Sequence, residues 1–274
     1  MNDKINRLFK EQLIEWGLAR DNYNALKSVK VKTLDVNGYC YQVQFNPARI
    51  ISSAAKVDSK SISERKCFLC NANLPAEQRG IPFKEQYTVL VNPYPIFPRH
   101  LTIPSVEHIP QQIASRFEDM LDLAQQLDEY VVFYNGAKCG ASAPDHFHFQ
   151  AGNKGFLPIE NDRNWKTIRI ESENREEMIY RFGQICDSLP IHPDEIEPRL
   201  NIITWYEHRQ WTTCIFPRTK HRPDCFSAEG DANMLISLAS VDMGGVFITP
   251  LEKDFIKITA VDIAGILDEV CESL

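Results

Sequence analysis

The segment 145–151, which reads DHFHFQA, places two histidines and a glutamine at alternating positions. In an extended strand, alternate side chains point to opposite faces of the sheet. His146, His148 and Gln150 therefore share one face of a predicted strand, and the apolar residues between them face the core. Two structural histidines on a strand would give the same pattern, so the motif alone does not decide between a structural and a catalytic role.

A run of small residues, 135–144, precedes this strand. Small side chains let backbone N–H groups approach an anion closely. We therefore predict that Asn135 at its start, and Gly140, Ala141 and Ser142 near its end, bind a phosphate-bearing substrate. Together the two segments indicate phosphate chemistry at a histidine.

The composition is that of a folded protein with an acidic balance: 274 residues, 43% hydrophobic, with a formal net charge of −7. With a pI near 5.6, the chain lacks the basic excess typical of nucleic-acid and membrane-surface binders. No stretch approaches the roughly 18 apolar residues of a membrane span, and the N-terminus shows no apolar signal core. We expect a cytoplasmic protein with no nucleic-acid or membrane partner, whose eight cysteines are thiols or metal ligands.

Two of these cysteines, Cys67 and Cys70, have the spacing that lets two thiolates reach one tetrahedral ion. A zinc site needs two further ligands, and His108 and His146 are the candidates because one lies just past a predicted strand and the other begins the next. With four protein ligands, such an ion is structural and closed. Two alternatives stay open: a redox pair of cysteines, and a metal-free His146 that orients His148 by a hydrogen bond.

The rest of the pattern predicts an α+β fold with antiparallel sheets and packed helices. We expect helices over 5–25, a hairpin over 31–43 with Asn37-Gly38 as its turn, a long surface loop over 44–66, strands over 87–91 and 100–103, and a helix over 117–131 that leads into the histidine strand.

A weak internal repeat indicates duplication of this unit. When residues 87–110 are aligned with 200–223, a proline, a histidine and a second proline coincide. The second copy is degenerate, because nothing after Pro223 reproduces the two-histidine motif; its nearest analogue is 235–248. We therefore divide the chain into an N-terminal helical segment (1–30), a catalytic repeat (31–160) and a degenerate second repeat (161–274).

Several of these segments carry a resemblance to a known superfamily: the two cysteines at 67 and 70, the segment 92–104, Asn135 and the motif 146–150. The chain resembles the duplicated branch of the histidine-triad superfamily, which includes galactose-1-phosphate uridylyltransferase, diadenosine polyphosphate phosphorylase and GDP-hexose phosphorylases. A glutamine in place of the third histidine is the most specific point. The resemblance implies a duplicated histidine-triad-like fold.

The resemblance also implies roles for the motif. His148 would attack phosphorus and become nucleotidylated, and Gln150 would hold a phosphate oxygen. A neutral imidazole is nucleophilic at pH 7 when its other nitrogen is fixed by a hydrogen bond. A carboxamide cannot donate a proton as an imidazolium can, so good leaving groups such as phosphate are favoured.

The uridylyltransferases of this branch carry zinc on residues that correspond to Cys67, Cys70, His108 and His146. The chain departs from their pattern in one place. Asp145 adds a residue between the serine of the small-residue run and the first histidine of the motif.

A substrate with two or three phosphates needs cations, and guanidinium groups suit its oxygens. Arg49 is the first candidate, because it stands where the family usually supplies a phosphate-binding arginine. Arg218 and Lys220 are the next candidates, from the second repeat. A solvated surface charge is the alternative for each. The histidines at 100, 192, 208 and 221 are interpreted as structural.

We therefore predict a nucleotidyltransferase or phosphorylase acting on a nucleoside polyphosphate or nucleotide sugar through a nucleotidyl-His148 intermediate. The acceptor would be phosphate or a sugar phosphate, zinc would be a structural cofactor, and the resemblance suggests a homodimer. The alternatives are a non-catalytic nucleotide-binding protein with a structural zinc, and a nucleotide hydrolase.

Overall fold

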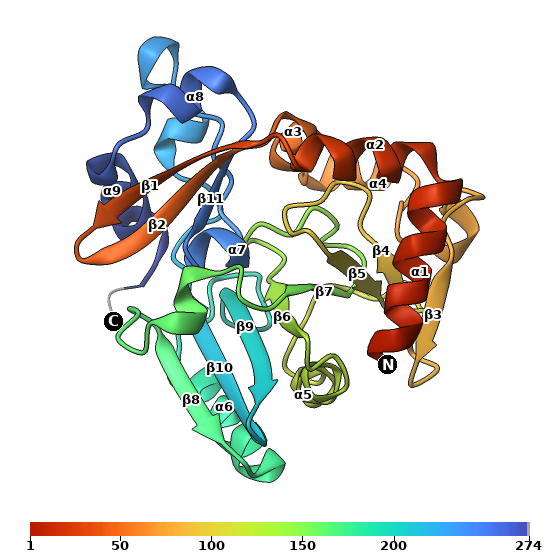
Figure 1. Cartoon of the computed structure of the whole chain (residues 1–274). Coiled ribbons are helices and arrows are strands. Elements are labelled where there is room, and N and C mark those ends of the chain that lie inside the picture. Colours follow the sequence, from red (N-terminus) through yellow and green to blue (C-terminus); the bar gives the residue numbers. More distant parts are fainter. Residues whose placement is uncertain (273–274) are drawn as a thin grey trace.

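The computed structural model describes residues 1–272 and begins with two helices, as the sequence predicts (Figure 1). Helix α1 spans Asn2–Glu15 and α2 spans Gly17–Leu26. Ile5, Leu8 and Phe9 are buried on one side of α1, which is the helical spacing expected of an amphipathic helix. This side packs against the outer strands β3 and β4 of the main sheet.

A hairpin follows at the predicted place. Strands β1 (Lys30–Val36) and β2 (Tyr39–Phe45) pair antiparallel through the turn at Asn37 and Gly38. Both turn residues have positive φ, 56° and 88°, which is the geometry of a type I′ turn. A third strand, β11 (Val246–Thr249), pairs parallel with β2, so this small sheet joins residues from opposite ends of the chain.

The main sheet has eight strands in the order β3-β4-β5-β7-β6-β9-β10-β8, and all neighbours are antiparallel. The strands are β3 (Gly80–Phe83), β4 (Tyr87–Val91), β5 (His100–Pro104), β6 (Tyr130–Asn135), β7 (His148–Asn153), β8 (Ile168–Ser172), β9 (Leu200–Glu207) and β10 (Gln210–Pro217). The predicted α+β class with antiparallel sheets is therefore confirmed.

Each face of this sheet covers its own apolar core. Along the central strand β6, Val132 and Tyr134 contribute to one core, which α1, α5 (Phe117–Gln126) and α6 (Arg175–Ser188) cover. Val131 and Phe133 contribute to the opposite core, which the small sheet and α9 (Ala260–Val270) cover. The alternation follows from the period of two residues in a strand.

The remaining helices are short: α3 (Ile50–Ser53), α4 (Ser59–Glu64), α7 (Ser240–Met243) and α8 (Glu252–Lys257). Single 3-10 turns lie at Pro47–Arg49, Asn71–Asn73, Pro158–Asn161, Asp224–Phe226 and Gly230–Ala232. Within residues 1–272, no helix combines the length and the apolar character needed to cross a membrane.

Two sequence-based expectations differ from the structure. The segment 44–66 holds α3 and α4 rather than forming one long loop. The helix expected over 117–131 ends at Gln126, and β6 begins at Tyr130. The residues of β6 are hydrophobic except for Asn135 at its end, and both of its faces are buried, so the strand lacks the alternation that identifies a half-exposed strand.

The aligned repeat segments correspond to two pairs of adjacent antiparallel strands, β4 with β5 and β9 with β10. The predicted counterpart of the histidine strand, 235–248, instead forms α7 and most of β11, which belongs to the small sheet. The division at residues 30 and 160 stays a prediction, and residues 273–274 of its last part lie outside the described chain.

Candidate active site and metal centre

His148 is the first residue of β7, and its imidazole is 3% exposed. Its Nδ1 lies 2.9 Å from the carbonyl oxygen of His146. Because a carbonyl can only accept, the ring proton is on Nδ1, and Nε2 keeps a free lone pair. Burial lowers the pKa of His148 to about 4, so the ring is neutral at pH 7. This is the state that a nitrogen nucleophile requires.

A buried glutamine that the sequence analysis missed holds the backbone of His148. The Gln111 side chain accepts from His148 N at 2.8 Å and donates to His148 O at 2.9 Å. It also donates to Asn135 O at 2.9 Å, which ties β7 to the end of β6. No sequence signal marks this residue, because its partners lie 24 and 37 positions away.

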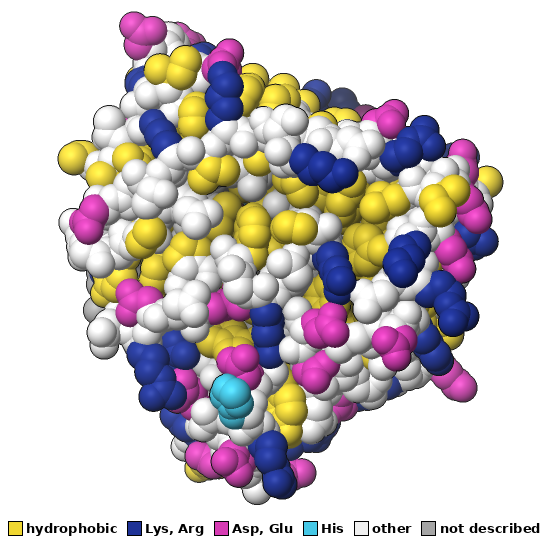
Figure 2. Space-filling view, in the orientation of Figure 1, with side chains coloured by type: hydrophobic (Ala, Val, Ile, Leu, Met, Phe, Trp, Pro, Cys, Tyr) yellow, Lys and Arg dark blue, Asp and Glu magenta, His cyan; other side chains and the backbone are white. Residues whose placement is uncertain are grey.

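The two cavity-facing side chains of the motif, His148 and Gln150, line a cavity of about 400 Å³. Asn135, Gly140, Ser142 and Arg49 also line it, as the sequence analysis predicts for a substrate site. Most of the other lining residues are apolar, and Figure 2 shows apolar side chains gathered in the hollowed centre of this face. Ala141 is not among the lining residues; its side chain is buried.

The small-residue run is shaped by contacts with the second half of the chain. Asn135 Oδ1 accepts from Asn201 Nδ2 at 3.0 Å and from both the backbone N and Oγ of Ser240 at 2.8 Å. The amide nitrogen of Asn135 is therefore left as a donor at the cavity wall. Gly140 has a φ of 91°, and a Cβ there would lie 2.4 Å from the carbonyl oxygen of Leu238. Only glycine fits this close approach.

Arg49 supplies a cation to the cavity. Its Nη1 donates to Tyr94 O at 2.7 Å, and its buried Nε has no partner within the described chain. Burial lowers the pKa of Arg49 to about 10, against the opposing effect of Asp242, so the group stays charged at pH 7. A buried guanidinium with an unused N–H is suited to a phosphate oxygen.

The other two predicted cations do not line the cavity. Arg218 is 1% exposed, and its guanidinium donates to Asn201 Oδ1 and to the carbonyl oxygens of Leu238, Lys220, His221 and Val270. Lys220 pairs with Asp224 and Glu269. Both cations thus join segments of the second half to each other.

The charged residue that this half brings to the cavity is Asp242. Its buried carboxylate accepts from two backbone N–H groups, and burial raises its pKa to about 6.

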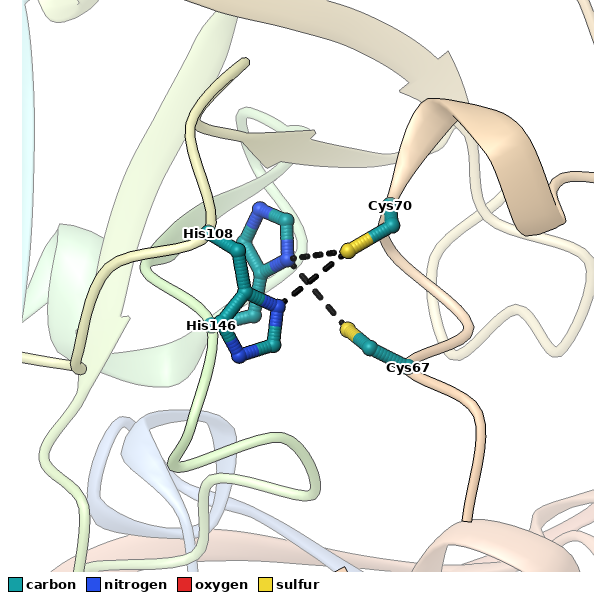
Figure 3. A group of neighbouring side chains, drawn as sticks. All are labelled: Cys67, Cys70, His108 and His146. Carbon is teal, nitrogen blue, oxygen red and sulfur yellow. Dashed lines mark hydrogen bonds between the residues drawn. The ribbon is translucent and has the colours of Figure 1, made fainter.

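The four predicted metal ligands converge. Cys67 and Cys70 lie between α4 and the turn at 71–73, His108 follows β5, and His146 precedes β7. Their sulfur and Nδ1 atoms all lie within 4.8 Å of one another. As Figure 3 shows, Cys70 Sγ lies 3.2 Å from His108 Nδ1 and 3.5 Å from His146 Nδ1, while Cys67 Sγ lies 3.3 Å from His146 Nδ1.

The second nitrogen of each histidine also has a partner. His146 Nε2 donates to Ser105 O at 2.8 Å, and His108 Nε2 lies 3.6 Å from a carboxylate oxygen of Asp145. The other oxygen of Asp145 pairs with Arg65 at 2.5 Å. Metal-binding histidines usually have such an outer carboxylate or carbonyl partner. Asp145, the extra residue of the motif, therefore lies beside His108 in the position of such an outer partner.

The sequence offers two roles for His146, a metal ligand or a hydrogen-bond partner of His148, and they involve different parts of the residue. The ring faces the thiols, and the carbonyl oxygen orients His148. Burial acts to raise the pKa of the Cys67 thiol, but hydrogen bonds with His146 and with two backbone N–H groups lower it to about 6. Two thiols and two imidazoles at these distances are a donor set that can hold one tetrahedral metal ion.

A family model described as Domain of unknown function (DUF4922) matches residues 8–153, which is more than half of the chain. The chain belongs to this family. The matched region contains the cysteine pair, the small-residue run and the histidine motif.

Curated relatives and solved structures extend the comparison. The galactose-1-phosphate uridylyltransferase of Clostridium acetobutylicum is 29% identical over 178 residues, which are 52% of this chain and 36% of the relative. The same enzyme of Halalkalibacterium halodurans is 32% identical over 121 residues, 38% of this chain and 24% of the relative. These matches thus span about a third or less of the relatives' length.

The crystal structure of yeast Ap4A phosphorylase Apa2 in complex with AMP covers 95% of this chain and 96% of its own, with a TM-score of 0.56 and 14% identity. A second crystal structure of yeast Ap4A phosphorylase Apa2 matches at a TM-score of 0.53. This likeness concerns the fold. The solved structure and the sequence relatives both support the resemblance to the duplicated histidine-triad-like branch.

Proposed function

We propose that the chain is a nucleotidyltransferase or phosphorylase that acts on a nucleoside polyphosphate or nucleotide sugar through a covalent nucleotidyl-His148. The observation that carries this proposal is the state of His148: a neutral ring with its proton held on Nδ1 and its Nε2 free at the wall of a cavity. The names of the sequence relatives and of the structural neighbour support the same class of reaction.

The reaction would proceed by two displacements. His148 Nε2 attacks the α-phosphorus and a P–N bond forms. The P–O bond to the leaving group, a sugar phosphate or the remaining polyphosphate, breaks with its electron pair on that oxygen. An oxygen of the acceptor, phosphate or a sugar phosphate, then attacks the same phosphorus. The P–N bond breaks, and the neutral imidazole is restored.

The residues around His148 have complementary roles in this scheme. Arg49 and Asn135 both line the cavity, and within residues 1–272 neither Arg49 Nε nor the amide nitrogen of Asn135 has an acceptor. Gln150 adds a carboxamide two residues beyond the nucleophile on the same face of β7. Such donors stabilise charge that develops on the phosphoryl oxygens.

We also propose that the cysteine–histidine cluster holds one zinc ion with a structural role. All four positions are protein ligands, so the ion has no open site for substrate. Binding would join the segment 67–70 to the start of β7, two residues before the nucleophile. Elemental analysis of the purified chain should find one zinc per chain, and Cys70→Ser should reduce that ratio. A fully folded chain without metal would contradict the zinc proposal.

The first experiment mixes the chain with ADP-glucose, GDP-glucose, GDP-mannose, UDP-glucose, UDP-galactose or diadenosine tetraphosphate, each with and without phosphate. Chromatography follows products, and intact-mass spectrometry follows an acid-labile nucleotidyl adduct. We expect His148→Ala to abolish the adduct and turnover while the fold stays intact.

His208→Asn is a matched control, because His208 is exposed at a turn with a positive φ of 50°, which asparagine tolerates. Binding without an adduct would instead indicate a nucleotide-binding protein. Steady turnover without an acceptor would indicate a hydrolase. The homodimer and the cytoplasmic location stay predictions, and sedimentation velocity tests the former.

A further inference from the structure

A second histidine lies behind the cavity and touches the motif. His100, the first residue of β5, is fully buried, and its two ring nitrogens have different partners. Nδ1 lies 3.1 Å from the backbone nitrogen of Ile96, and Nε2 lies 3.0 Å from Gln150 Oε1. The sequence analysis interpreted this histidine as structural.

The partners of His100 determine where its proton is. The backbone N–H of Ile96 can only donate, so Nδ1 must accept and carries no proton. Burial, together with the charge of Arg49, lowers the pKa of His100 to about 3, so the ring stays neutral at physiological pH. The single ring proton is therefore on Nε2, which donates to Gln150.

This hydrogen bond decides the orientation of the Gln150 carboxamide. Its oxygen is occupied by His100, so the amide nitrogen is the atom left for the cavity that Gln150 lines. Within residues 1–272, that nitrogen has no acceptor. A rotation of the amide by half a turn would present the oxygen to the substrate instead, and an oxygen repels a phosphate oxygen.

The ring of His100 is itself held in place. Tyr23 Oη donates to His100 O at 3.0 Å and accepts from His100 N at 3.2 Å, so α2 fixes the backbone on which the ring is mounted. The rings of Phe97 and Phe133 lie 5.4 and 5.9 Å from the imidazole, centroid to centroid. A ring packed in this way cannot turn over to exchange its two nitrogens without displacing its neighbours.

We propose that His100 is a positioning residue that holds the Gln150 amide with its N–H groups toward the transferred phosphoryl group. The inference rests on the proposed function for its catalytic consequence. The proton assignment and the amide orientation do not depend on that function, because they follow from the hydrogen-bond partners of His100. His100 does not touch the reacting atoms; it acts through Gln150.

Two substitutions separate the two hydrogen bonds. In His100→Asn, the side-chain amide can replace Nδ1 as the partner of Ile96 but does not reach Gln150. In His100→Gln, the amide nitrogen can replace Nε2 as the donor to Gln150. We expect His100→Asn and Gln150→Ala each to lower kcat about tenfold, for whichever nucleotide of the panel turns over. His100→Gln should recover most of this loss, although it loses the bond to Ile96.

The double variant His100→Asn, Gln150→Ala should be no slower than either single variant, because both remove the same oriented donor. A purely structural role predicts instead that the two losses multiply, and that His100→Asn and His100→Gln lose activity in proportion to their loss of Tm. Either of these results would overturn the proposal. His208→Asn again serves as the control for replacing a histidine.

A second measurement is independent of turnover. In the unmodified chain with 15N-labelled histidine, long-range 1H–15N spectra should show a neutral His100 with its proton on Nε2. With 15N-labelled glutamine, added pyrophosphate should shift the side-chain amide signal of Gln150, and His100→Asn should weaken this response. A proton on Nδ1 would overturn the inference itself, whereas correct NMR signals without turnover of any nucleotide would count only against the proposed function.

Discussion

Gln111 offers the most direct test of how the chain positions its nucleophile. Its carboxamide makes three hydrogen bonds of 2.8 to 2.9 Å, two to the backbone of His148 and one to Asn135 O, and the side chain is 2% exposed. Pro104 lies opposite His148 on β5 and has no N–H. The neighbouring strand therefore cannot replace the donor that Gln111 supplies at this position.

The substitution Gln111→Met keeps the length of the side chain and removes all three bonds. Each buried hydrogen bond contributes about 1 kcal/mol net, and leaving a buried backbone group unpaired adds about 1–3 kcal/mol. We therefore expect the free energy of unfolding to fall by about 4–6 kcal/mol. This is a large part of the roughly 5–15 kcal/mol that holds a typical domain folded.

Urea unfolding, followed by circular dichroism, measures this loss, and Gln125→Met on the exposed side of α5 is the matched control. Hydrogen exchange shows where the stability is lost. The amide of His148 should lose protection in Gln111→Met, while the amides of β9 keep theirs. A loss below about 1 kcal/mol, or unchanged protection at His148, would refute the conclusion that this carboxamide holds the nucleophile strand.

Three further predictions concern the same region. Gly140→Ala should destabilise the chain, because the new Cβ would lie 2.4 Å from Leu238 O at a φ of 91°. Thermal unfolding measures the loss of stability, and Gly183→Ala, with open space around its Cβ, is the control. Arg218→Met should lower the free energy of unfolding by about 3–5 kcal/mol without changing the nucleotide affinity of the folded fraction. A loss of affinity without a loss of stability would instead indicate that Arg218 binds the substrate. Burial lowers the pKa of His100 to about 3, so its ring is neutral in the folded chain. In the unfolded chain the same ring takes up a proton below its ordinary pKa of about 6.5. Stability should therefore fall as the pH drops from 6.5 toward 3, by up to about 5 kcal/mol from this group, and His100→Gln should show a shallower pH dependence in denaturant titrations; an identical slope would contradict the shift.

The sequence determined the parts of this protein that depend on neighbours along the chain. The alternation in 145–151 predicts which side chains face the core, and Phe147 and Phe149 are indeed buried there. The Asn37-Gly38 pair predicts its hairpin because few other dipeptides accept two positive φ angles. The spacing of Cys67 and Cys70 likewise indicates a shared ligand site, and the structure brings both to the histidines.

Local patterns were less informative where an element is buried on both sides. Strand β6 has no exposed face, so the sequence does not mark where the preceding helix ends and the strand begins. The site residues found by sequence are those whose motif is local or matches the resemblance. Asp242 matches no such motif, although it brings a carboxyl to the cavity from the second half of the chain.

Only the tertiary structure decided which cation serves the cavity and which polar residues support the motif. The sequence names both Arg49 and Arg218 as candidates. In the described chain, Arg49 keeps a buried N–H without a partner, whereas the Arg218 guanidinium donates to several carbonyl oxygens. Gln111 and His100 act on β7 from 37 and 50 positions away. Such contacts depend on strand order and register, and these are set by how the whole chain buries its two cores rather than by any local periodicity.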